Sequence, residues 1–500
     1  RDLIKATQDP DYIKRCIADR ENLGLDVVYV TDLILNMQDK EFMKSCIANR
    51  EVLKLGSYAI RDLIKATQDP DYIKKCIADR ENLGLDVDYV TDLILNTQGK
   101  EFMKSCIADR ESLGLNTSTA VKLILLTGDL EYIEECKKNA AKLKLEQEDV
   151  EKLSVFTKKT NINLPPEMTI GIEIETEGEK DNKEQIKKLL TKTGWKAKSD
   201  SSLENGTEVV SPILTGDPEN STDEIRRVCA VLNGVPQTTS ERCGGHIHIG
   251  ADYLTSKQDW VNLIEIWANA EKVLYTICNE KGSIPRNGVP KYAQPISKKI
   301  EEAMKTGTIS LEGEEDLSKF VSTVTTIQDS RYFGINFNNV GNSKKNTIEF
   351  RLPNGTINPN TWIENINLFG GIIRSAHELS AIQEKPEEQR TDTERRMLDS
   401  FEMLQTEENE EQIAKALIKL CITPEQRHVY MERYVTNKPL LDNSPEIKDA
   451  ITRQISTSKI GKKIFTGKDA INGEDYNQGT AIIEGELARD NITHGIEQGE

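Results

Sequence analysis

The sequence predicts an α+β protein in which an all-α array of helical repeats precedes a sheet domain. Two observations support this prediction. The first third of the chain repeats itself with helix-type spacing of apolar residues, and residues 168–380 then alternate strand-like and helix-like segments. A length of 500 residues exceeds what one hydrophobic core usually organises. We therefore expect repeats at 1–159, a linker at 160–167, a sheet domain at 168–435 and a polar, largely mobile tail at 436–500.

The charge and composition of the chain exclude several classes of partner. The formal net charge is -18 and the pI is near 5.0, so nucleic-acid phosphates and anionic lipids would be repelled. No uninterrupted apolar run approaches the ~18 residues that cross a bilayer. We therefore expect a cytoplasmic protein that binds neither nucleic acid nor membrane. The sequence starts at Arg1 inside a repeat, so the earlier removal of a leader stays open.

A 30-residue unit recurs through the first third of the chain. Residues 1–55 and 61–115 differ at only seven positions, and the apolar residues of the second helix in each unit fall three and four apart. Only a neighbouring repeat can cover such a stripe, so we expect a solenoid that binds a protein partner. A spacer or oligomerisation arm is the alternative. The predicted copies are 2–31, 32–61, 62–91, 92–121 and a divergent one at 122–151.

Four strand-like segments of the sheet domain share one design. Strand side chains alternate between two faces, so residues two apart share a face. Each segment places apolar side chains on one face and carboxylate, imidazole or guanidinium groups on the other. The apolar face is expected to pack against helices. The segments are 171–175, 207–211, 244–249 and 347–352.

The polar face of this predicted sheet indicates a metal site. Carboxylates held close together raise one another's pKa and destabilise a fold, whereas divalent cations turn the repulsion into coordination. Oxygen ligands with an imidazole suit Mg²⁺ or Mn²⁺ better than zinc. Taken singly, each segment is more often solvated surface or a hydrogen-bonded histidine pair, and their joint occurrence favours the metal site. The polar groups are those of Glu173, Glu175, Glu208, His246, His248, Glu349 and Arg351.

These segments resemble the putative amidoligase family, carboxylate–amine ligases that share the fold of glutamine synthetase and glutamate–cysteine ligase. The resemblance covers about 168–380 and rests on 171–175, 200–212, 244–249, 331–336 and 347–356 in that order. It implies a glutamine-synthetase-like antiparallel sheet with helices packed on one face. It also implies metal ligation by Glu173, Glu175, Glu208, His246 and Glu349, nucleotide or phosphate contacts by His248, Arg331 and Arg351, and polar roles beside the substrate or nucleotide for Asp200 and Asn336.

The function implied by the resemblance is ATP-dependent amide formation. A carboxylate is a poor electrophile, and phosphorylation by ATP converts it into an acyl phosphate. Two or three Mg²⁺ or Mn²⁺ ions and the arginines would stabilise the transferring phosphoryl group. Asp200 is the candidate proton acceptor for the attacking amine. The substrates would be a carboxylate and an amine, peptides and proteins included.

Three alternatives to the ligase remain open from the sequence. The first is a kinase or phosphotransferase on the same fold. The second is a binding scaffold in which the repeats act and the sheet domain is inactive, although the intact polar residues argue against it. The third is a hydrolytic zinc site built on His246 and His248, which lacks a third nitrogen or sulfur ligand.

Overall fold

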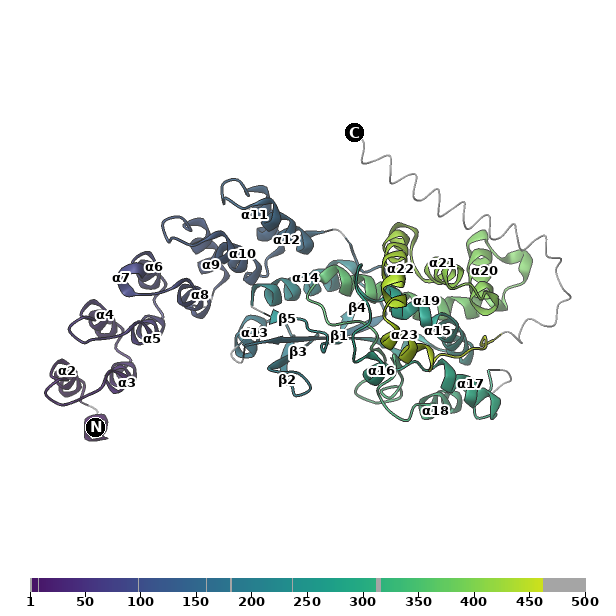
Figure 1. Cartoon of the computed structure of the whole chain (residues 1–500), viewed down its shortest axis with the longest axis horizontal. Coiled ribbons are helices and arrows are strands. Elements are labelled where there is room, and N and C mark those ends of the chain that lie inside the picture. The colour runs from purple at the N-terminus through teal and green to yellow at the C-terminus, as the bar shows by residue number, and fades with distance from the viewer. Residues whose placement is uncertain are drawn as a thin grey trace. The chain divides into compact units, whose positions relative to one another are not determined.

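The structure is a computed structural model that describes residues 2–7, 9–97, 99–158, 160–179, 182–235, 237–311 and 316–461. The chain divides into two compact units (Figure 1). One comprises Arg1–Thr157 with Asn233–Val235, and the other comprises Lys158–Leu232 with Pro236–Glu500. They are called the repeat array and the sheet domain below. Within the described residues, no helix combines the length and the apolar composition needed to span a membrane.

The repeat array is built from pairs of helices, one pair for each 30-residue repeat (Figure 1). The first helices of successive repeats contact one another, as α3 does with α5 and α5 with α8. The recurring cysteines are buried within the array. The helices are α1 (Asp2–Ala6), α2 (Pro10–Ala18), α3 (Val27–Met37), α4 (Lys40–Ala48), α5 (Ser57–Thr67), α6 (Pro70–Ala78), α7 (Arg80–Leu83), α8 (Val87–Asn96), α9 (Lys100–Ala108), α10 (Thr117–Leu126), α11 (Leu130–Lys138) and α12 (Gln147–Thr157).

Helix caps set where each repeat begins. The side chain of Asp26 accepts a hydrogen bond from the backbone N–H of Tyr29 at 2.8 Å, and α3 starts at Val27. Such a cap satisfies a backbone donor that the first turn of a helix leaves without an intrahelical partner. The predicted boundary between copies at residues 31 and 32 therefore falls inside α3 and is corrected to the cap. A repeat period fixes the length of the unit but not its starting point.

The sheet domain contains one antiparallel sheet of eight strands, which confirms the mixed class of helices and antiparallel sheet. The strands are hydrogen-bonded in the order β2-β3-β1-β6-β8-β7, and β4 and β5 both pair with β1. Their bounds are β1 (Thr169–Gly178), β2 (Lys196–Asp200), β3 (Gly206–Val210), β4 (Leu214–Thr215), β5 (Gln237–Thr238), β6 (Gly245–Gly250), β7 (Ile335–Asn336) and β8 (Thr347–Phe350).

Two long helices, α15 and α19, cover the apolar face of the sheet. Trp267 of α15 and Phe369 of α19 pack on Phe350 of β8, with ring centroids 5.5 and 4.6 Å from that ring. The helices of this domain are α13 (Asn182–Leu190), α14 (Pro218–Gly234), α15 (Lys257–Ile277), α16 (Val289–Tyr292), α17 (Ser297–Lys305), α18 (Leu317–Ile327), α19 (Pro359–Glu384), α20 (Asp392–Thr406), α21 (Glu410–Cys421), α22 (Arg427–Asp442) and α23 (Pro445–Thr452), with 3-10 turns η1 (Ala251–Tyr253), η2 (Glu387–Gln389) and η3 (Pro424–Gln426).

Helices of the sheet domain continue past residue 435, where the sequence predicts that the tail begins. Helix α22 runs to Asp442, and α23 follows it. The backbone N–H of Ile460 then donates to Asn269 Oδ1 of α15 at 2.9 Å. The start of the tail at 436 is therefore wrong, because polar composition conceals helices that pack through few apolar residues. The rest of the predicted tail, residues 462–500, lies outside the described residues.

Candidate active site

Strand register brings the predicted polar side chains onto one face of the sheet. Residues directly opposite one another in an antiparallel pair point to the same face. The pairs across β3, β1, β6, β8 and β7 therefore form a continuous row of polar groups. The register pairs Glu175 with Glu208, Glu173 with His246, His248 with Glu349, and Asn336 with Glu349.

These side chains line one cavity of about 690 Å³ in the sheet domain. Residues far apart in the sequence meet there, because each strand carries its polar groups to the same side. All ten residues that the sequence singled out lie on the cavity wall: Glu173, Glu175, Asp200, Glu208, His246, His248, Arg331, Asn336, Glu349 and Arg351.

Glu173 lies between the two imidazoles of β6. His246 Nδ1 is 3.1 Å from Glu173 Oε2, and His248 Nε2 is 3.4 Å from Glu173 Oε1. His246 also approaches Glu349, with Nδ1 3.7 Å from Glu349 Oε1. The centre of the cavity is therefore a compact group of carboxylates and imidazoles.

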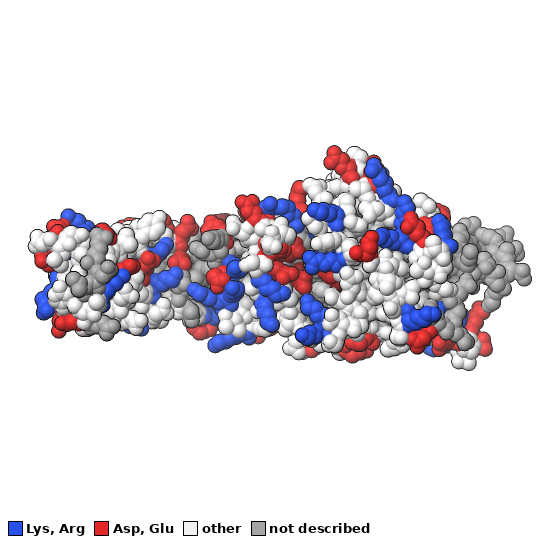
Figure 2. Space-filling view, turned by 90° about the horizontal axis from the view of Figure 1, so that it is seen from below, with Lys and Arg blue, Asp and Glu red and all other residues white. Residues whose placement is uncertain are grey.

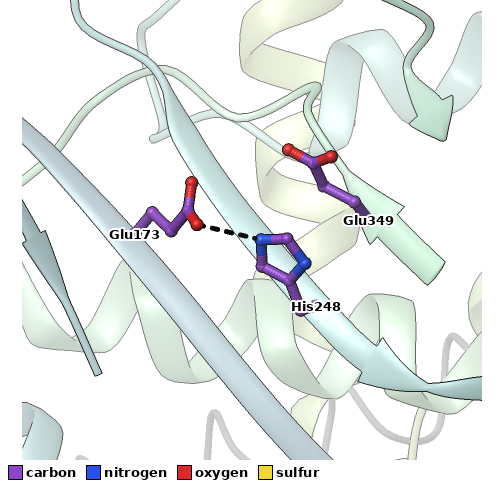
Figure 3. Close-up of side chains that lie close together, drawn as sticks. All are labelled: Glu173, His248 and Glu349. Carbon is purple, nitrogen blue, oxygen red and sulfur yellow. Dashed lines mark ion pairs between the residues drawn. The ribbon is translucent and has the colours of Figure 1, made fainter. Parts of the chain in front are cut away.

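Three of these residues have the spacing of a metal site. Ligand atoms of Glu173, His248 and Glu349 lie within 4.8 Å of one another, and Figure 3 shows His248 between the two carboxylates. The sequence predicts a nucleotide contact for His248, whereas this geometry groups it with the candidate metal ligands. His246 has the ligand role in the prediction, and it lies two residues before His248 on the same face of β6.

Two imidazole nitrogens in the cavity fit an additional ligand. His246 Nε2 and His248 Nε2 are buried, and neither meets hydrogen-bond geometry with a described residue, although they lie 3.6 Å from Glu175 Oε1 and 3.4 Å from Glu173 Oε1. A buried polar atom without a partner is costly, so such atoms usually meet water, an ion or a substrate. Together with the carboxylates they form a donor set rich in oxygen. That set matches Mg²⁺ or Mn²⁺ better than a closed zinc site.

The charged state of the carboxylates depends on their partners. Burial alone would raise the pKa of Glu173, but the hydrogen bond to His246 and the adjacent His248 imidazole hold it well below its usual value. Burial acts in the same way on Glu349, and the Arg351 guanidinium beside it is the main cause that lowers its pKa. Burial and the neighbouring Glu173 carboxylate raise the pKa of Glu208 to about 7. The cavity thus keeps a negative charge at Glu173 and Glu349.

Hydrogen bonds hold Glu349 and Arg351 in place at the cavity wall. Asn336 Nδ2 donates to Glu349 Oε2 at 2.6 Å, and Arg351 Nη1 donates to Glu349 Oε1. Arg351 Nε also donates to the carbonyl of Tyr292 at 3.2 Å. The guanidinium groups of Arg331 and Arg351 lie 5.3 and 6.0 Å from the centroid of the Tyr332 ring. Two guanidinium groups that share one ring form a suitable surface for phosphate oxygens.

Asp200 lies at the end of β2 and lines the same cavity. Its Oδ1 accepts hydrogen bonds from Ser202 Oγ at 2.6 Å and from the Ser202 backbone N–H at 2.8 Å. The second carboxylate oxygen has no hydrogen bond to a described residue. Asp200 is therefore positioned at the wall with one oxygen available as a proton acceptor.

Sequence reasoning missed several residues of this cavity, including Arg286, Tyr292 and Lys345. They lie outside the strands, where side chains follow no period of two. One signal could have revealed Arg286. A Cβ added at Gly244 would lie 2.5 Å from the Arg286 guanidinium, so the Gly-Gly pair before His246 marks a close approach of another segment.

Residues 129–373 match the family model described as putative amidoligase enzyme. This match confirms the resemblance seen in the sequence, and the family suggests a ligase. The matched range starts in the last repeat, earlier than residue 168, and ends within α19. All ten predicted site residues lie inside it. A search of curated proteins finds none that matches the chain.

Proposed function

Because residues 129–373 match the amidoligase family, we propose that the chain is an ATP- and metal-dependent ligase that joins a carboxylate to an amine. The observation that carries this proposal is that the four predicted glutamates, two predicted histidines and two predicted arginines all line one cavity. On this proposal the antiparallel sheet is the glutamine-synthetase-like sheet of carboxylate–amine ligases. Its polar face holds the reactants, and its apolar face anchors the sheet on α15 and α19.

The residues that would hold metal ions are Glu173, Glu175, Glu208, Glu349 and the imidazoles of β6. Bound there, two or three Mg²⁺ or Mn²⁺ ions would neutralise the charge that develops on the transferring phosphoryl group. The protein keeps Glu349 ionised and oriented through Asn336 and Arg351. The fit rests on two buried imidazole nitrogens that meet no hydrogen-bond geometry with a described residue and that face the carboxylates of Glu173 and Glu175.

The proposed reaction has two steps. An oxygen of the substrate carboxylate attacks the γ-phosphorus of ATP, so ADP leaves and an acyl phosphate forms. The amine nitrogen then attacks the acyl carbon, phosphate leaves, and the amine proton passes to a base. Arg331 and Arg351 would bind the phosphoryl oxygens in both steps. Asp200 would accept the proton, since one of its oxygens is available at the wall.

The repeat array would recruit a protein partner or a protein substrate as a helical solenoid. Val28 and Tyr58 occupy equivalent positions of two successive repeats, and these residues are 74% and 67% exposed. Large apolar side chains exposed at a repeat interval are typical of protein-binding arrays. On the face shown in Figure 2, Lys and Arg are mixed with Asp and Glu among the described residues, so this face offers no broad basic surface to nucleic acid.

The test is a screen of carboxylates and amines with ATP and Mg²⁺, in which ADP release is measured and products are identified by mass spectrometry. We expect ADP and an amide to appear together, and EDTA to stop both. Glu173→Gln should lower ADP release by at least about 100-fold, because it removes a charge from the metal-binding group. Glu446→Gln, an exposed carboxylate of α23, is the matched control and should keep full activity.

Two outcomes would refute the ligase. One is ADP release that persists in EDTA. The other is wild-type activity of Glu173→Gln in a protein with an unchanged unfolding midpoint. ADP release with a phosphorylated product and no amide would instead support a phosphotransferase on the same sheet.

A further inference from the structure

A second cavity, of about 280 Å³, adjoins the candidate active site. It lies between the segment before β6, the loop after α15 and the loop after β8. Glu241, Arg286 and Asn287 line both cavities, so the two spaces share one wall. None of the ten predicted site residues lines this second cavity.

The shared wall has a fixed part and an exposed part. Arg286 is buried, and its guanidinium donates to the carbonyls of Pro353 at 2.7 Å and Cys243 at 3.4 Å. These bonds anchor the guanidinium to the backbone on both sides of the wall. The exposed part is a hydrogen bond from Asn287 Nδ2 to Glu241 Oε2 at 2.7 Å. That bond can open without disturbing the core, since both side chains lie at the surface.

The far wall of the second cavity carries a carboxylate that is held in place without a cation. Glu280 Oε1 accepts hydrogen bonds from Thr356 Oγ1 at 2.6 Å and from Thr361 Oγ1 at 2.9 Å. Among the described residues, no Lys, Arg or His forms an ion pair with Glu280 or with Glu241. Two hydroxyl donors therefore orient a half-buried carboxylate that forms no ion pair with the described residues around it.

The charges of the lining favour a cationic ligand. Glu241 and Glu280 contribute two negative charges and Arg286 one positive charge, which leaves a formal net charge of one negative unit. The Cys278 thiol adds none, because burial raises its pKa to about 12. Complementary charge selects the partner of a polar cavity and disfavours a ligand of the same sign. A volume below the roughly 300–1,000 Å³ of typical ligand sites limits the ligand to a few carbon atoms.

We propose that the second cavity binds the amine co-substrate as a small diamine. One ammonium group lies against Glu280 at the far wall, and the other lies beside Glu241 at the wall shared with the active site. This inference rests on the proposed function, because it assigns a place to the amine of that reaction. The observation that selects a diamine is that Glu241 and Glu280 both line this cavity and neither forms an ion pair with a described residue. The nitrogen beside Glu241 then reaches the active site when the bond between Glu241 and Asn287 opens.

Binding to the full chain can be tested without turnover, by titration calorimetry with two probes of equal chain length. The probes are 1,4-diaminobutane and 4-aminobutyrate, which differ by the replacement of one aminomethyl end with a carboxylate. We expect 1,4-diaminobutane to bind at least about tenfold more tightly. ATP is absent from this experiment, so a chain without ligase activity would still bind the diamine. Failure of the ligase proposal and failure of the diamine site are therefore distinguishable.

Two variants locate the binding. Glu280→Gln keeps the contacts with the two threonine hydroxyls and removes the negative charge. The affinity for 1,4-diaminobutane should therefore fall at least tenfold. Ser283→Phe fills the cavity from the loop after α15 and should cause a similar loss. Glu446→Gln, which removes an exposed charge elsewhere, should bind like wild type, and unfolding midpoints verify that each variant folds. The proposal is overturned if 4-aminobutyrate binds wild type as tightly as the diamine does, or if Glu280→Gln and Ser283→Phe both bind the diamine like wild type.

Discussion

Buried glutamates of the sheet domain differ in charge because their partners differ. Glu173 and Glu349 lie beside imidazoles and a guanidinium, and these groups hold their pKa values below the usual range although burial acts in the opposite direction. Within the described part of the chain, the side-chain partner of Glu265 in α15 is an amide, Gln405 Nε2, at 2.6 Å from its Oε2. Burial raises the pKa of Glu265 to about 8. The cavity glutamates are thus ionised and can bind a cation, whereas the core carboxyl of Glu265 is held in its neutral form up to a higher pH.

Glu265→Gln should stabilise the protein at high pH. The pKa of this carboxyl rises from 4.5 to about 8 on folding, so the folded state binds the proton more tightly than the unfolded state does. The stability of the wild type therefore falls, relative to the variant, as pH rises from 4.5 to about 8, by at most about 1.4 kcal/mol per pH unit. We expect the variant to unfold several degrees above the wild type at pH 9 and much closer to it at pH 5.

Thermal unfolding followed by tryptophan fluorescence at pH 5, 7 and 9 measures this difference. Glu446→Gln provides the control, since an exposed carboxylate should give no such trend. A difference between Glu265→Gln and wild type that stays constant across these pH values would contradict the assignment of a neutral buried carboxyl.

The strand residues of the candidate site could be predicted because alternation and burial act on them together. A slip of one residue in β6 would turn His246 and His248 toward α19 and expose Ile247, so the sequence fixes which side each faces. The same reasoning fails for Arg286 and Lys345. Their position depends on loops that follow no period, and only the fold brings those loops to the cavity wall.

In the repeat array, one aspartate both starts a helix and joins two repeats. Asp69 Oδ1 accepts from the backbone N–H of Tyr72 at 3.1 Å, and Lys44 of the preceding repeat lies 2.8 Å from Asp69 Oδ2. Asp39 and Asp129 occupy the equivalent positions and make the same two contacts. Gly99 occupies the equivalent position before α9, where the cap has no side-chain hydrogen bond. The sequence of one repeat therefore lacks a contact that its neighbours have.

Gly99→Asp should stabilise the start of α9. The φ angle of Gly99 is 171°, an extended conformation that any residue adopts, and an added Cβ would meet nothing closer than 4.0 Å. An aspartate cap exceeds glycine by a few tenths of a kcal/mol, and an ion pair with Lys74 would act in the same direction. We expect amide hydrogen exchange in the first turn of α9 to slow by roughly twofold.

The reciprocal variant provides the matched control. Asp39→Gly should speed exchange in the first turn of α4 by a similar factor and leave α9 unchanged. Equal exchange rates in both variants and the wild type would show that these caps do not govern the helix ends.

Other element boundaries could not be read from the sequence, for physical reasons. The strands β4, β5 and β7 have two residues each, too few for an alternating pattern. Their pairing depends on the neighbouring strand instead. A helix is predicted at 424–434, but α22 runs on through Pro439 to Asp442 with few buried apolar residues, so its composition does not reveal where it ends.

The two units of the chain can be followed separately because their reporters differ. All four tryptophans belong to the sheet domain, whereas the repeat array has none. The tryptophans are Trp195, Trp260, Trp267 and Trp362, and each is buried. Their fluorescence therefore reports unfolding of the unit that contains the candidate metal site. Far-UV circular dichroism reports the helices of both units.

Mn²⁺ should raise the unfolding midpoint of the sheet domain through Glu349. An ion that binds only the folded state stabilises it by about 2.7 kcal/mol at a concentration of 100 Kd, and the cavity residues exist as a group only in the folded sheet. We expect the fluorescence midpoint of the wild type to rise by several degrees in Mn²⁺. Glu349→Gln should lose most of that rise, because it removes an ionised ligand within 4.8 Å of Glu173 and His248.

Comparing each variant with itself, with and without Mn²⁺, separates the metal effect from any change that Glu349→Gln makes to the fold. Glu446→Gln keeps all cavity residues and should show the full rise. The repeat array contributes no residue to the candidate metal site. Its unfolding is detected by circular dichroism and not by tryptophan fluorescence, and the midpoint of that transition should not change with Mn²⁺. An equal rise in Glu349→Gln and wild type would place the ion elsewhere, and no rise in either would remove the metal from the proposed reaction.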